Sequence, residues 1–462
     1  MKSAIKLISE QLSEFLDLIF KSLKNNSLSL LRISETWDII LNINLKLKKA
    51  YDLKIWKNKY YTYNLKGINM DLVIKNCKFV DKAGQFHIKV EDGKITDISK
   101  TPIKGEKIVD IKDNYIMPGF IDPHIHFRDP GLTQKEDFKT GSSSAAAGGF
   151  TTVIDMPNTL PKTNTYKALK EKIEIAKNKS IINFELQAGH NTLDEMKKMV
   201  KLNPISFKVF MDLESDESLK KIFNDLSVLK KTTDYNGLVA THCEKKSIVE
   251  RETENQKLKE KNEAIDYTYA RPTDSEDVSV KQAIELANAN DLRLHICHLS
   301  SSKSLDIVKN ASKTMPVSWE FTPHHLLLEN SAYNTYGTFI KTNPPLRPKE
   351  ESVRISDLDE TSIIGTDHAP HTLEDKTKGV WTSSPGIPNL ETVVPLILTE
   401  VNKGNVDLKI IPKIFSENVA RVYELKNKGQ IAVGKDADFT VINLKQKLNT
   451  PHLMVGNILV CQ

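Results

Sequence analysis

Between residues 119 and 423, short apolar runs alternate with stretches of helical spacing, and this alternation constrains the fold more than any other feature. Most gaps hold helix-like sequence, such as TYKALKEKIEIAKN and DVSVKQAIELANAN. Strands that alternate with helices predict a parallel α/β fold, and eight strands are the number in a closed (β/α)8 TIM-like barrel. The eight runs are FIDPHIHF, FTTVIDM, NFELQAG, SFKVFM, GLVATHCE, RLHICHL, VSWEFTPHHL and SIIGTDH.

Both flanks of this region carry shorter β-like sequence. Residues 70–118 include DLVIKNCKFV and FHIKVEDGKITDI, in which Asp92-Gly93 predicts a hairpin turn. GQIAVGKDADFTVINL, near the other end, has the same turn-rich character. We therefore expect a small β-sandwich formed by residues 70–118 together with 424–462, beside a barrel of residues 119–423. Because LMVGNILVCQ is all that follows FTVINLKQKLNTPH, we expect this sandwich to be reduced.

Residues 1–69 differ from the rest in charge, with twelve Lys/Arg against six Asp/Glu, whereas the remainder has 53 against 54. The net charge of +5 therefore belongs to this segment, and the rest shows no basic footprint for nucleic acid. Helical spacing of apolar residues from Ile5 to Ile19 predicts one amphipathic helix. Two interpretations are open: a basic extension, or upstream sequence included by a wrongly chosen start codon. We favour the second, because Met70 opens a natural β segment.

The chain lacks the sequence features of a membrane or secreted protein. No run of eighteen apolar residues occurs, so no membrane span is expected, and MKSAIKLISEQLSEF lacks the apolar core of a signal peptide. Four cysteines without CxxC spacing argue against a disulfide scaffold. We therefore predict a cytoplasmic protein with neither a membrane nor a nucleic acid as partner. The cysteines are Cys77, Cys243, Cys297 and Cys461.

Ten of the twelve histidines lie between residues 124 and 371, many of them at the ends of predicted strands. His124 and His126 are two apart in a strand, so both point to one face and can share a metal. His242, His298 and Asp367 end later strands, and this donor set suits zinc or a similar metal. Buried structural histidines are the alternative for each residue taken singly. Of the pair in RLHICHL, we take His298 as the ligand and His295 as a packing residue.

Lys208 ends the fourth predicted strand among apolar neighbours, where a free ammonium is costly. Desolvation favours the neutral amine of a lysine. Such an amine can add carbon dioxide and become an anionic carbamate, whose two oxygens can bridge two cations. The alternative is a salt-bridged or snorkelling lysine.

The motifs PGFIDPHIHFRDPG, DMPNT, FKVFM, HLSS, NPPLR and GTDHAPH, in this order, resemble the dihydroorotase branch of the amidohydrolase superfamily over about residues 70–440. The resemblance implies reversible hydrolysis of (S)-dihydroorotate to N-carbamoyl-L-aspartate in de novo pyrimidine (UMP) synthesis. The attacking group would be a hydroxide held by a binuclear zinc centre. His124, His126 and Asp367 would hold one metal, and His242 and His298 the other. Carboxylated Lys208 would bridge them, and Asp367 would also carry the proton.

The resemblance also implies a set of substrate contacts. Arg128 can take the ring carboxylate as a bidentate fork. Without the family, the asparagines beside proline would be read as turn residues. Some relatives have an aspartate in place of the bridging lysine, and FKVFM matches the lysine version. The further implied contacts, to the carboxylate and ring, are Asn158, Asn343, His371 and the main-chain groups of Pro385 and Gly386.

Other functions fit the sequence less well. An allantoinase or hydantoinase-like cyclic amidohydrolase would use the same metal site on a different ring, but Arg128 and Asn158 argue against both. A non-catalytic homologue that serves as a pathway partner is expected to have lost metal ligands, and none is missing. A homodimer and an association with aspartate transcarbamoylase are both left open by the sequence.

Overall fold

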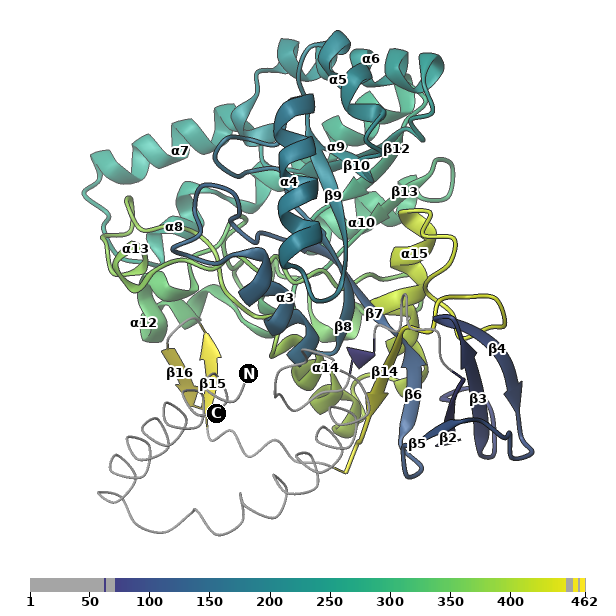
Figure 1. The fold of residues 1–462 in the computed structure, drawn as a ribbon. Coiled ribbons are helices and arrows are strands. Elements are labelled where there is room, and N and C mark those ends of the chain that lie inside the picture. Colours follow the sequence, from purple (N-terminus) through teal and green to yellow (C-terminus); the bar gives the residue numbers. More distant parts are fainter. Residues whose placement is uncertain (1–61, 64–70, 446–451, 456–457, 462) are drawn as a thin grey trace, which may run out of the picture. The chain divides into compact units, whose positions relative to one another are not determined.

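The computed structural model describes residues 62–63, 71–445, 452–455 and 458–461 (Figure 1). Its central element is a curled sheet of seven strands in the order β13-β12-β11-β10-β9-β8-β7, and every neighbouring pair is parallel. The seven match the first seven predicted runs. They are β7 (Phe120–Ile125), β8 (Phe150–Asp155), β9 (Asn183–Gly189), β10 (Ser206–Phe210), β11 (Leu238–His242), β12 (Arg293–Ile296) and β13 (Val317–Trp319).

The eighth predicted run, residues 362–368, joins the two edges of this sheet without forming a regular strand. It makes one parallel bridge to β7 and one to the segment that follows β13. The Thr366 amide donates to Asp122 Oδ1 at 3.1 Å, and the Thr366 hydroxyl donates to the same carboxylate. The Asp122 side chain thus accepts from the Thr366 amide, which in a regular strand would donate to the backbone of a neighbouring strand. Local sequence could not predict this contact. The sheet closed in this way is a TIM-like barrel.

Helices follow most of the strands and cover the outside of the barrel (Figure 1). Helix α3 (Phe138–Ala147) begins with a capping box between Asp137 and Thr140, and α4 (Tyr166–Lys179) begins at the N-cap Thr165. α3 contacts β8, and α4 contacts β9. The other α-helices are α5 (Leu193–Val200), α6 (Asp216–Thr232), α7 (Lys246–Leu258), α8 (Asp266–Ala270), α9 (Thr273–Ala289), α10 (Ser302–Ala311), α11 (Pro323–Leu327), α12 (Tyr333–Tyr336), α13 (Leu373–Lys376), α14 (Val393–Asn402) and α15 (Asn418–Val422). Shorter turns are the 3₁₀ segments Met211–Leu213, Asn330–Ala332, Gly337–Ile340, Ile355–Asp357 and Leu408–Ile410, and the π segment Lys413–Glu417.

Aromatic rings pack at the amino ends of the barrel strands, away from the histidines. Phe120 stacks on Phe415 with ring centroids 5.0 Å apart, and Phe150 meets Phe415 edge-on at 6.1 Å. All three rings are fully buried. Because apolar packing is concentrated at this end, polar side chains that begin at the other end of the strands are free to face a cavity.

Two small sheets lie outside the barrel. One has the order β4-β3-β2-β5, and the other has the order β1-β14-β6. Asp92 and Gly93 join β3 to β4 with φ of 51° and 72°, the pair of positive φ angles that a type I′ hairpin turn requires. Leu72, Ile88 and Phe439, from both sheets, belong to one buried cluster. The strands are β1 (Thr62–Tyr63), β2 (Leu72–Cys77), β3 (Phe86–Glu91), β4 (Lys94–Ser99), β5 (Lys107–Asp110), β6 (Tyr115–Pro118) and β14 (Phe439–Ile442).

The two ends of the chain contribute differently from the prediction. β1 lies within the segment that the sequence set apart as an extension, yet it pairs antiparallel with β14. The remainder of that segment, including the predicted amphipathic helix, lies outside the described residues. Toward the other end, β15 (His452–Val455) and β16 (Ile458–Cys461) pair with one another as a two-stranded sheet, while β14 joins β6.

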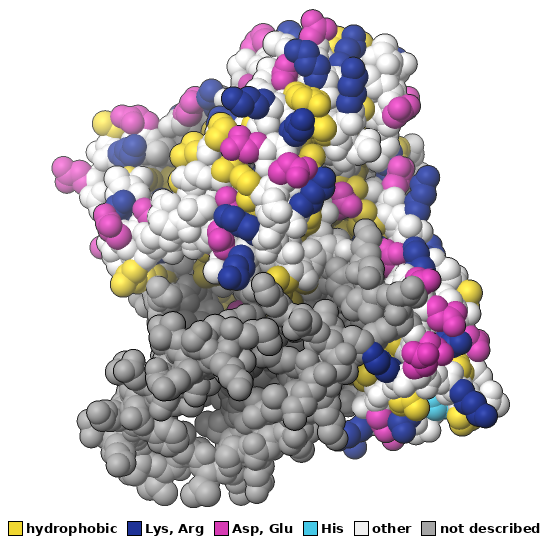
Figure 2. All heavy atoms as spheres, in the orientation of Figure 1, with side chains coloured by type: hydrophobic (Ala, Val, Ile, Leu, Met, Phe, Trp, Pro, Cys, Tyr) yellow, Lys and Arg dark blue, Asp and Glu magenta, His cyan; other side chains and the backbone are white. Residues whose placement is uncertain are grey.

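The surface shown in Figure 2 mixes charges of both signs. Lys and Arg side chains stand among Asp and Glu side chains over the described part of this face. On helix α6, for example, Lys221 pairs with Asp225 at one-turn spacing. In the part of the chain that the structure describes, no helix is both long enough and apolar enough to cross a lipid bilayer.

Candidate active site

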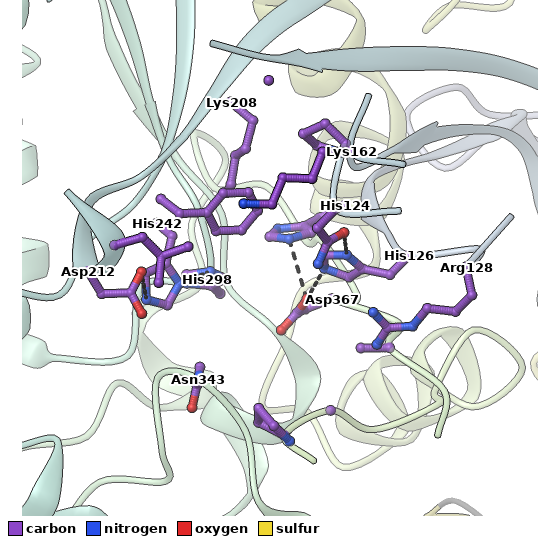
Figure 3. A pocket seen from close by; sticks show the side chains of 18 of the residues that line it. His124, His126, Arg128, Lys162, Lys208, Asp212, His242, His298, Asn343 and Asp367 are labelled. Atoms are coloured by element: carbon purple, nitrogen blue, oxygen red, sulfur yellow. Dashed lines mark hydrogen bonds and ion pairs between the residues drawn. The ribbon is translucent and has the colours of Figure 1, made fainter. Parts of the chain in front are cut away.

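Every residue predicted for the site lines one cavity of about 530 Å³. The lining includes His126, just after β7, together with Phe210 and His242, the last residues of β10 and β11. The cavity therefore lies at the carboxyl ends of the barrel strands (Figure 3). The predicted residues that line it are His124, His126, Arg128, Asn158, Lys208, His242, His298, Asn343, Asp367, His371, Pro385 and Gly386.

His124, His126 and Asp367 form a compact cluster. Asp367 Oδ1 lies 2.9 Å from His126 Nε2 and 3.3 Å from His124 Nε2 (Figure 3). One ligand atom from each residue lies within 4.8 Å of the others. Burial opposes ionisation of Asp367, but the two imidazoles outweigh burial and hold its pKa well below the usual range. The cluster thus offers two nitrogens and one carboxylate oxygen, a ligand set that zinc accepts.

The backbone at this end of the barrel adopts an uncommon conformation at three site residues. Arg128, His298 and Asp367 have φ of 56°, 37° and 48°. Non-glycine residues rarely adopt positive φ, and each such residue costs free energy that surrounding structure must offset. The strain fits a site in which side chains are aimed at a common point.

Hydrogen-bond partners behind the rings orient the imidazoles of His124 and His126. Glu320 Oε1 contacts His124 Nδ1, and Asn158 Oδ1 lies 2.7 Å from His126 Nδ1. Both rings therefore keep Nε2 toward Asp367, the arrangement usual for metal-binding histidines. Burial opposes a charge on His124, yet Glu320 and Asp367 raise its pKa to about 10. Two carboxylates around one imidazole call for positive charge, which a divalent cation would supply.

His242 and His298 form a second cluster. His242 Nδ1 lies 3.0 Å from His298 Nε2, and His242 Nε2 lies 2.8 Å from Glu244 Oε2. Since zinc–nitrogen bonds are about 2.0–2.1 Å long, two nitrogens this close can share one ion. Burial, with His242 and His124 nearby, lowers the pKa of His298 well below its usual value, so its ring is neutral, the form that binds metal. His298 Nδ1 is also buried without a hydrogen-bond partner among the described residues.

Lys208 is 1% exposed and contacts no carboxylate among the described residues. Its ammonium lies 2.8 Å from the Cys297 thiol and over the ring of Phe210. Lys172, the other fully buried lysine near the barrel strands, has the partners that a buried ammonium usually needs. It pairs with Asp155 at 2.6 Å and donates to the Met156 carbonyl. The contrast sets Lys208 apart from an ordinary buried lysine.

These observations fit a metal centre. The two histidine clusters lie on either side of Lys208 in the cavity lining, and their donor types are those of zinc. Two further groups have metal-ligand spacing and were not predicted: one joins His124 with Cys297 and Glu320, the other joins His242 with Asp212 and Glu244. In the second group, Arg271 already neutralises Glu244 and Asp212, which favours an orienting network around His242 over a separate metal site.

Three arginines are buried, and only one of them is without a carboxylate among the described residues. Arg347 pairs with Glu276, and Arg271 pairs with Glu244. Arg128, which is 7% exposed, forms no ion pair with the described residues. Its contacts are Pro370 O at 3.3 Å and His371 Nε2 at 3.0 Å, and its guanidinium faces the cavity (Figure 3).

The tautomer of His371 determines whether this ring accepts a hydrogen bond from the Arg128 guanidinium. Burial, with Arg128 and Lys135 nearby, lowers the pKa of His371 to about 3, so the ring is neutral. Lys135 donates to Nδ1 at 3.0 Å, so Nε2 carries the hydrogen and donates to Pro385 O at 2.9 Å. Arg128 therefore has no acceptor in His371, and its Nη N–H groups are available to an anion, while Nε donates to Pro370 O.

The remaining predicted contacts are partly engaged within the protein. Asn343 Oδ1 accepts from the Tyr267 hydroxyl at 2.7 Å, which leaves the Asn343 amide hydrogens free to donate. Gly386 N donates to the Lys341 carbonyl at 2.8 Å, and Gly386 O accepts from Lys376 Nζ at 2.9 Å. The Gly386 N–H is therefore already used, whereas carbonyl oxygens keep a second lone pair for a ring N–H.

Sequence reasoning missed several side chains around the cavity. Glu244 and Glu320 each stand at the end of an apolar run, and a carboxylate in that setting is a signal that a partner must exist. His295 does not line the cavity, since its nitrogens contact Ser318 and Glu320. The unpredicted polar residues of the cavity lining itself are Lys162, Asn164, His190, Asp212 and Glu214.

Comparisons with known proteins agree with this geometry. Residues 115–458 match the model of the amidohydrolase family. The chain is 45% identical over 382 residues to a dihydroorotase of Methanosphaera stadtmanae, covering 81% of this chain and 87% of that one. It is 44% identical over 376 residues to a dihydroorotase of Methanothermobacter thermautotrophicus, covering 81% and 85%. Among solved structures, an L-hydantoinase (dihydropyrimidinase) from Arthrobacter aurescens superposes with a TM-score of 0.75 at 29% identity, covering 80% of this chain and 86% of that one.

The chain therefore belongs to the amidohydrolase family. Within that family, its curated relatives at 44–45% identity are dihydroorotases, as the motif series predicted. The hydantoinase likeness, at lower identity, supports the barrel fold.

Proposed function

We propose that this chain is a hydrolase of cyclic amides that interconverts dihydroorotate and N-carbamoyl-L-aspartate, as dihydroorotases do. The relatives at 44–45% identity over most of the chain support this assignment. The observation that carries it is Arg128: a buried guanidinium without a carboxylate partner among the described residues, facing the cavity beside the metal-binding clusters. A buried, unpaired cation is costly, so an anionic substrate is the expected partner.

We propose that His124, His126 and Asp367 hold one divalent metal and that His242 and His298 hold a second. Lys208, carboxylated by carbon dioxide, would supply an anion to both metals, and zinc is the metal that this donor set suits best. When bound, such ions would lower the pKa of a water molecule, so that hydroxide would be available near neutral pH, and would polarise the substrate carbonyl.

The protein's own groups then act on a fixed ring. Arg128 holds the ring carboxylate, the Asn343 amide donates to a ring carbonyl, and the Pro385 carbonyl accepts from a ring N–H. As the hydroxide oxygen attacks the ring amide carbon, Asp367 takes the proton of the hydroxide. The ring carbon–nitrogen bond breaks, and Asp367 returns that proton to the leaving nitrogen. Ring closure follows the same steps in reverse and releases water.

The main alternative is a hydantoinase or allantoinase activity, and a hydantoinase and a dihydropyrimidinase are among the solved structures of similar fold. Hydantoin and allantoin lack the ring carboxylate of dihydroorotate. With either ring, Arg128 would stay buried and unpaired, which is the unfavourable outcome. Arg128 therefore favours dihydroorotate.

Replacing Arg128 by glutamine tests the assignment. We expect the catalytic efficiency with dihydroorotate to fall at least about tenfold, since a charge-assisted hydrogen bond contributes about 1.5–3 kcal/mol. Turnover should fall as well as affinity, because the carboxylate contact also aligns the amide carbon. Arg128→Lys should rescue only in part, because lysine lacks the planar fork.

Arg251→Gln is the matched control for this change. Arg251 lies on α7, pairs with Glu252 at the surface and does not line the cavity. Both variants should keep the metal content of the wild type, and Arg251→Gln should keep its efficiency. An Arg128→Gln protein that handles dihydroorotate as well as the wild type would refute the carboxylate contact.

The domain organisation supports this site without contributing to it. We propose that the two small sheets, with their common buried cluster, form a β-sandwich built mainly from residues 70–118 and β14, with β1 added at one edge, and that residues 119–423 carry all of the chemistry. The status of residues 1–69, a homodimer, and an association with aspartate transcarbamoylase stay predictions.

A further inference from the structure

Lys162 is a cation of the cavity that the mechanism above does not use. It stands in the loop after β8, lines the cavity, and is directed into it (Figure 3). It is exposed, and no ion pair or hydrogen bond joins its ammonium to the described residues. The other two basic side chains just described differ in this respect: Arg128 is assigned to the ring carboxylate, and Lys208, which is buried against Cys297, is assigned to the carbamate.

The backbone around Lys162 is firmly held. Thr159 Oγ1 lies 3.0 Å from Thr163 Oγ1 and donates to Pro161 O at 2.9 Å. The Thr163 amide donates to Pro157 O at 2.8 Å, and Gly189 N donates to Thr163 O at 2.9 Å. Thr159 and Thr163 are both buried. These hydrogen bonds fix the position of the Lys162 backbone, while its side-chain ammonium can still move to contact a ligand.

The proposed reaction creates negative charge within this cavity. Dihydroorotate is a monoanion, whereas N-carbamoyl-aspartate has two carboxylates and is a dianion. Addition of hydroxide to the ring amide also gives a dianionic adduct. Arg128 is assigned to the ring carboxylate, which is charged in both substrate and product. The second negative charge forms at the amide carbon that opens, beside the metal-binding clusters.

We propose that Lys162 contacts this second carboxylate, and the charge that precedes it in the transition state, and so determines specificity for the open-chain dianion. The inference rests on the proposed function. Asp212 and Glu214 also line the cavity, but each already has partners: Arg271 for Asp212, and His190 and Ser218 for Glu214. Lys162 is therefore the exposed cation in the described lining that is left for an incoming carboxylate.

The expected kinetic pattern differs between the two directions. In ring opening, the ground state lacks the second charge and the transition state has it, so loss of Lys162 lowers kcat and leaves KM nearly unchanged. In ring closure, both states carry the charge, so the same loss raises KM and leaves kcat nearly unchanged. Because the overall equilibrium constant is fixed, kcat/KM must fall by the same factor in both directions.

The test uses the full chain with its metals and three variants: Lys162→Gln, Lys162→Arg and Lys167→Gln. Lys167 is an exposed lysine on α4 outside the cavity lining and serves as the control. We expect Lys162→Gln to lower kcat/KM about threefold to tenfold at low salt, as suits a partly solvated ion pair, and less at high salt. Lys162→Arg and Lys167→Gln should stay close to wild type, and metal content should be unchanged in all three.

Several results would overturn the inference. They are equal kinetics of Lys162→Gln and wild type, a fall in kcat alone in both directions, and loss of metal from Lys162→Gln, which would mean that the lysine maintains the structure of the metal centre and does not act on the substrate. A wild-type protein inactive on both compounds would instead refute the proposed function, so the two failures are distinguishable.

Discussion

Lys208→Ala is expected to lose bound metal and activity together. Lys208 is 1% exposed and has no carboxylate partner among the described residues, so a structural role as an ion-paired lysine has no support. As a carbamate it would be an anion between two clusters that otherwise bring four imidazoles and one carboxylate. Without this anion, two nearby cations repel each other with little to offset it. Elemental analysis should therefore show metal content falling from about two equivalents per chain, the stoichiometry of a two-metal site, toward none.

Two controls separate this reading from general damage to the fold. Short carboxylic acids added to Lys208→Ala should restore part of both metal and activity, because they replace the missing anion. Cys297→Ala removes the hydrogen-bond partner at 2.8 Å and keeps the lysine, so it should keep its metal. Carbon-13 bicarbonate labelling of active wild type that leaves Lys208 unmodified would contradict the carbamate.

Asp367→Asn is expected to bring turnover of dihydroorotate down by about 10²–10⁴-fold, the usual contribution of a positioned general acid–base group, or further if metal is also lost. The amide cannot take and return a proton, although it has nearly the same shape. Asparagine is the appropriate replacement because Asp367 has φ of 48°, a conformation that asparagine tolerates better than most residues.

The measurement is a single-turnover rate with dihydroorotate, beside metal content and the thermal midpoint. The midpoint should be close to that of the wild type, since the amide oxygen of the replacement side chain can still contact the two imidazoles. An Asp367→Asn protein that retains metal and a wild-type rate would show that another group carries the proton.

The strand-end histidines show what the sequence made predictable. His124, His242 and Asp367 belong to different runs, yet a parallel barrel brings the carboxyl ends of all its strands to one face, so their convergence followed from counting strands. The motif series then added Arg128 and Asn343, which local spacing alone would have left as a loop cation and a turn residue.

The contacts around the ligands were not predictable in the same way. Glu320 contacts His124, although the two are 196 residues apart in the sequence, and a contact at that separation produces no periodic sequence pattern. Asn158 was predicted to contact the substrate, and it lines the cavity; its oxygen also lies 2.7 Å from His126 Nδ1, a contact that the sequence did not indicate. The eighth strand became irregular because Asp122 takes the Thr366 amide.

Initial rates of the purified wild type with dihydroorotate, hydantoin and allantoin, before and after treatment with a chelator, test whether this protein is a metal-dependent dihydroorotase. The carboxylate contact at Arg128 predicts that dihydroorotate exceeds the other two in kcat/KM by at least about tenfold, the lower bound for one charge-assisted hydrogen bond. The histidine clusters predict that the chelator abolishes this activity and that added zinc restores it. A preference for hydantoin or allantoin, or activity that is indifferent to the chelator, would contradict the assignment.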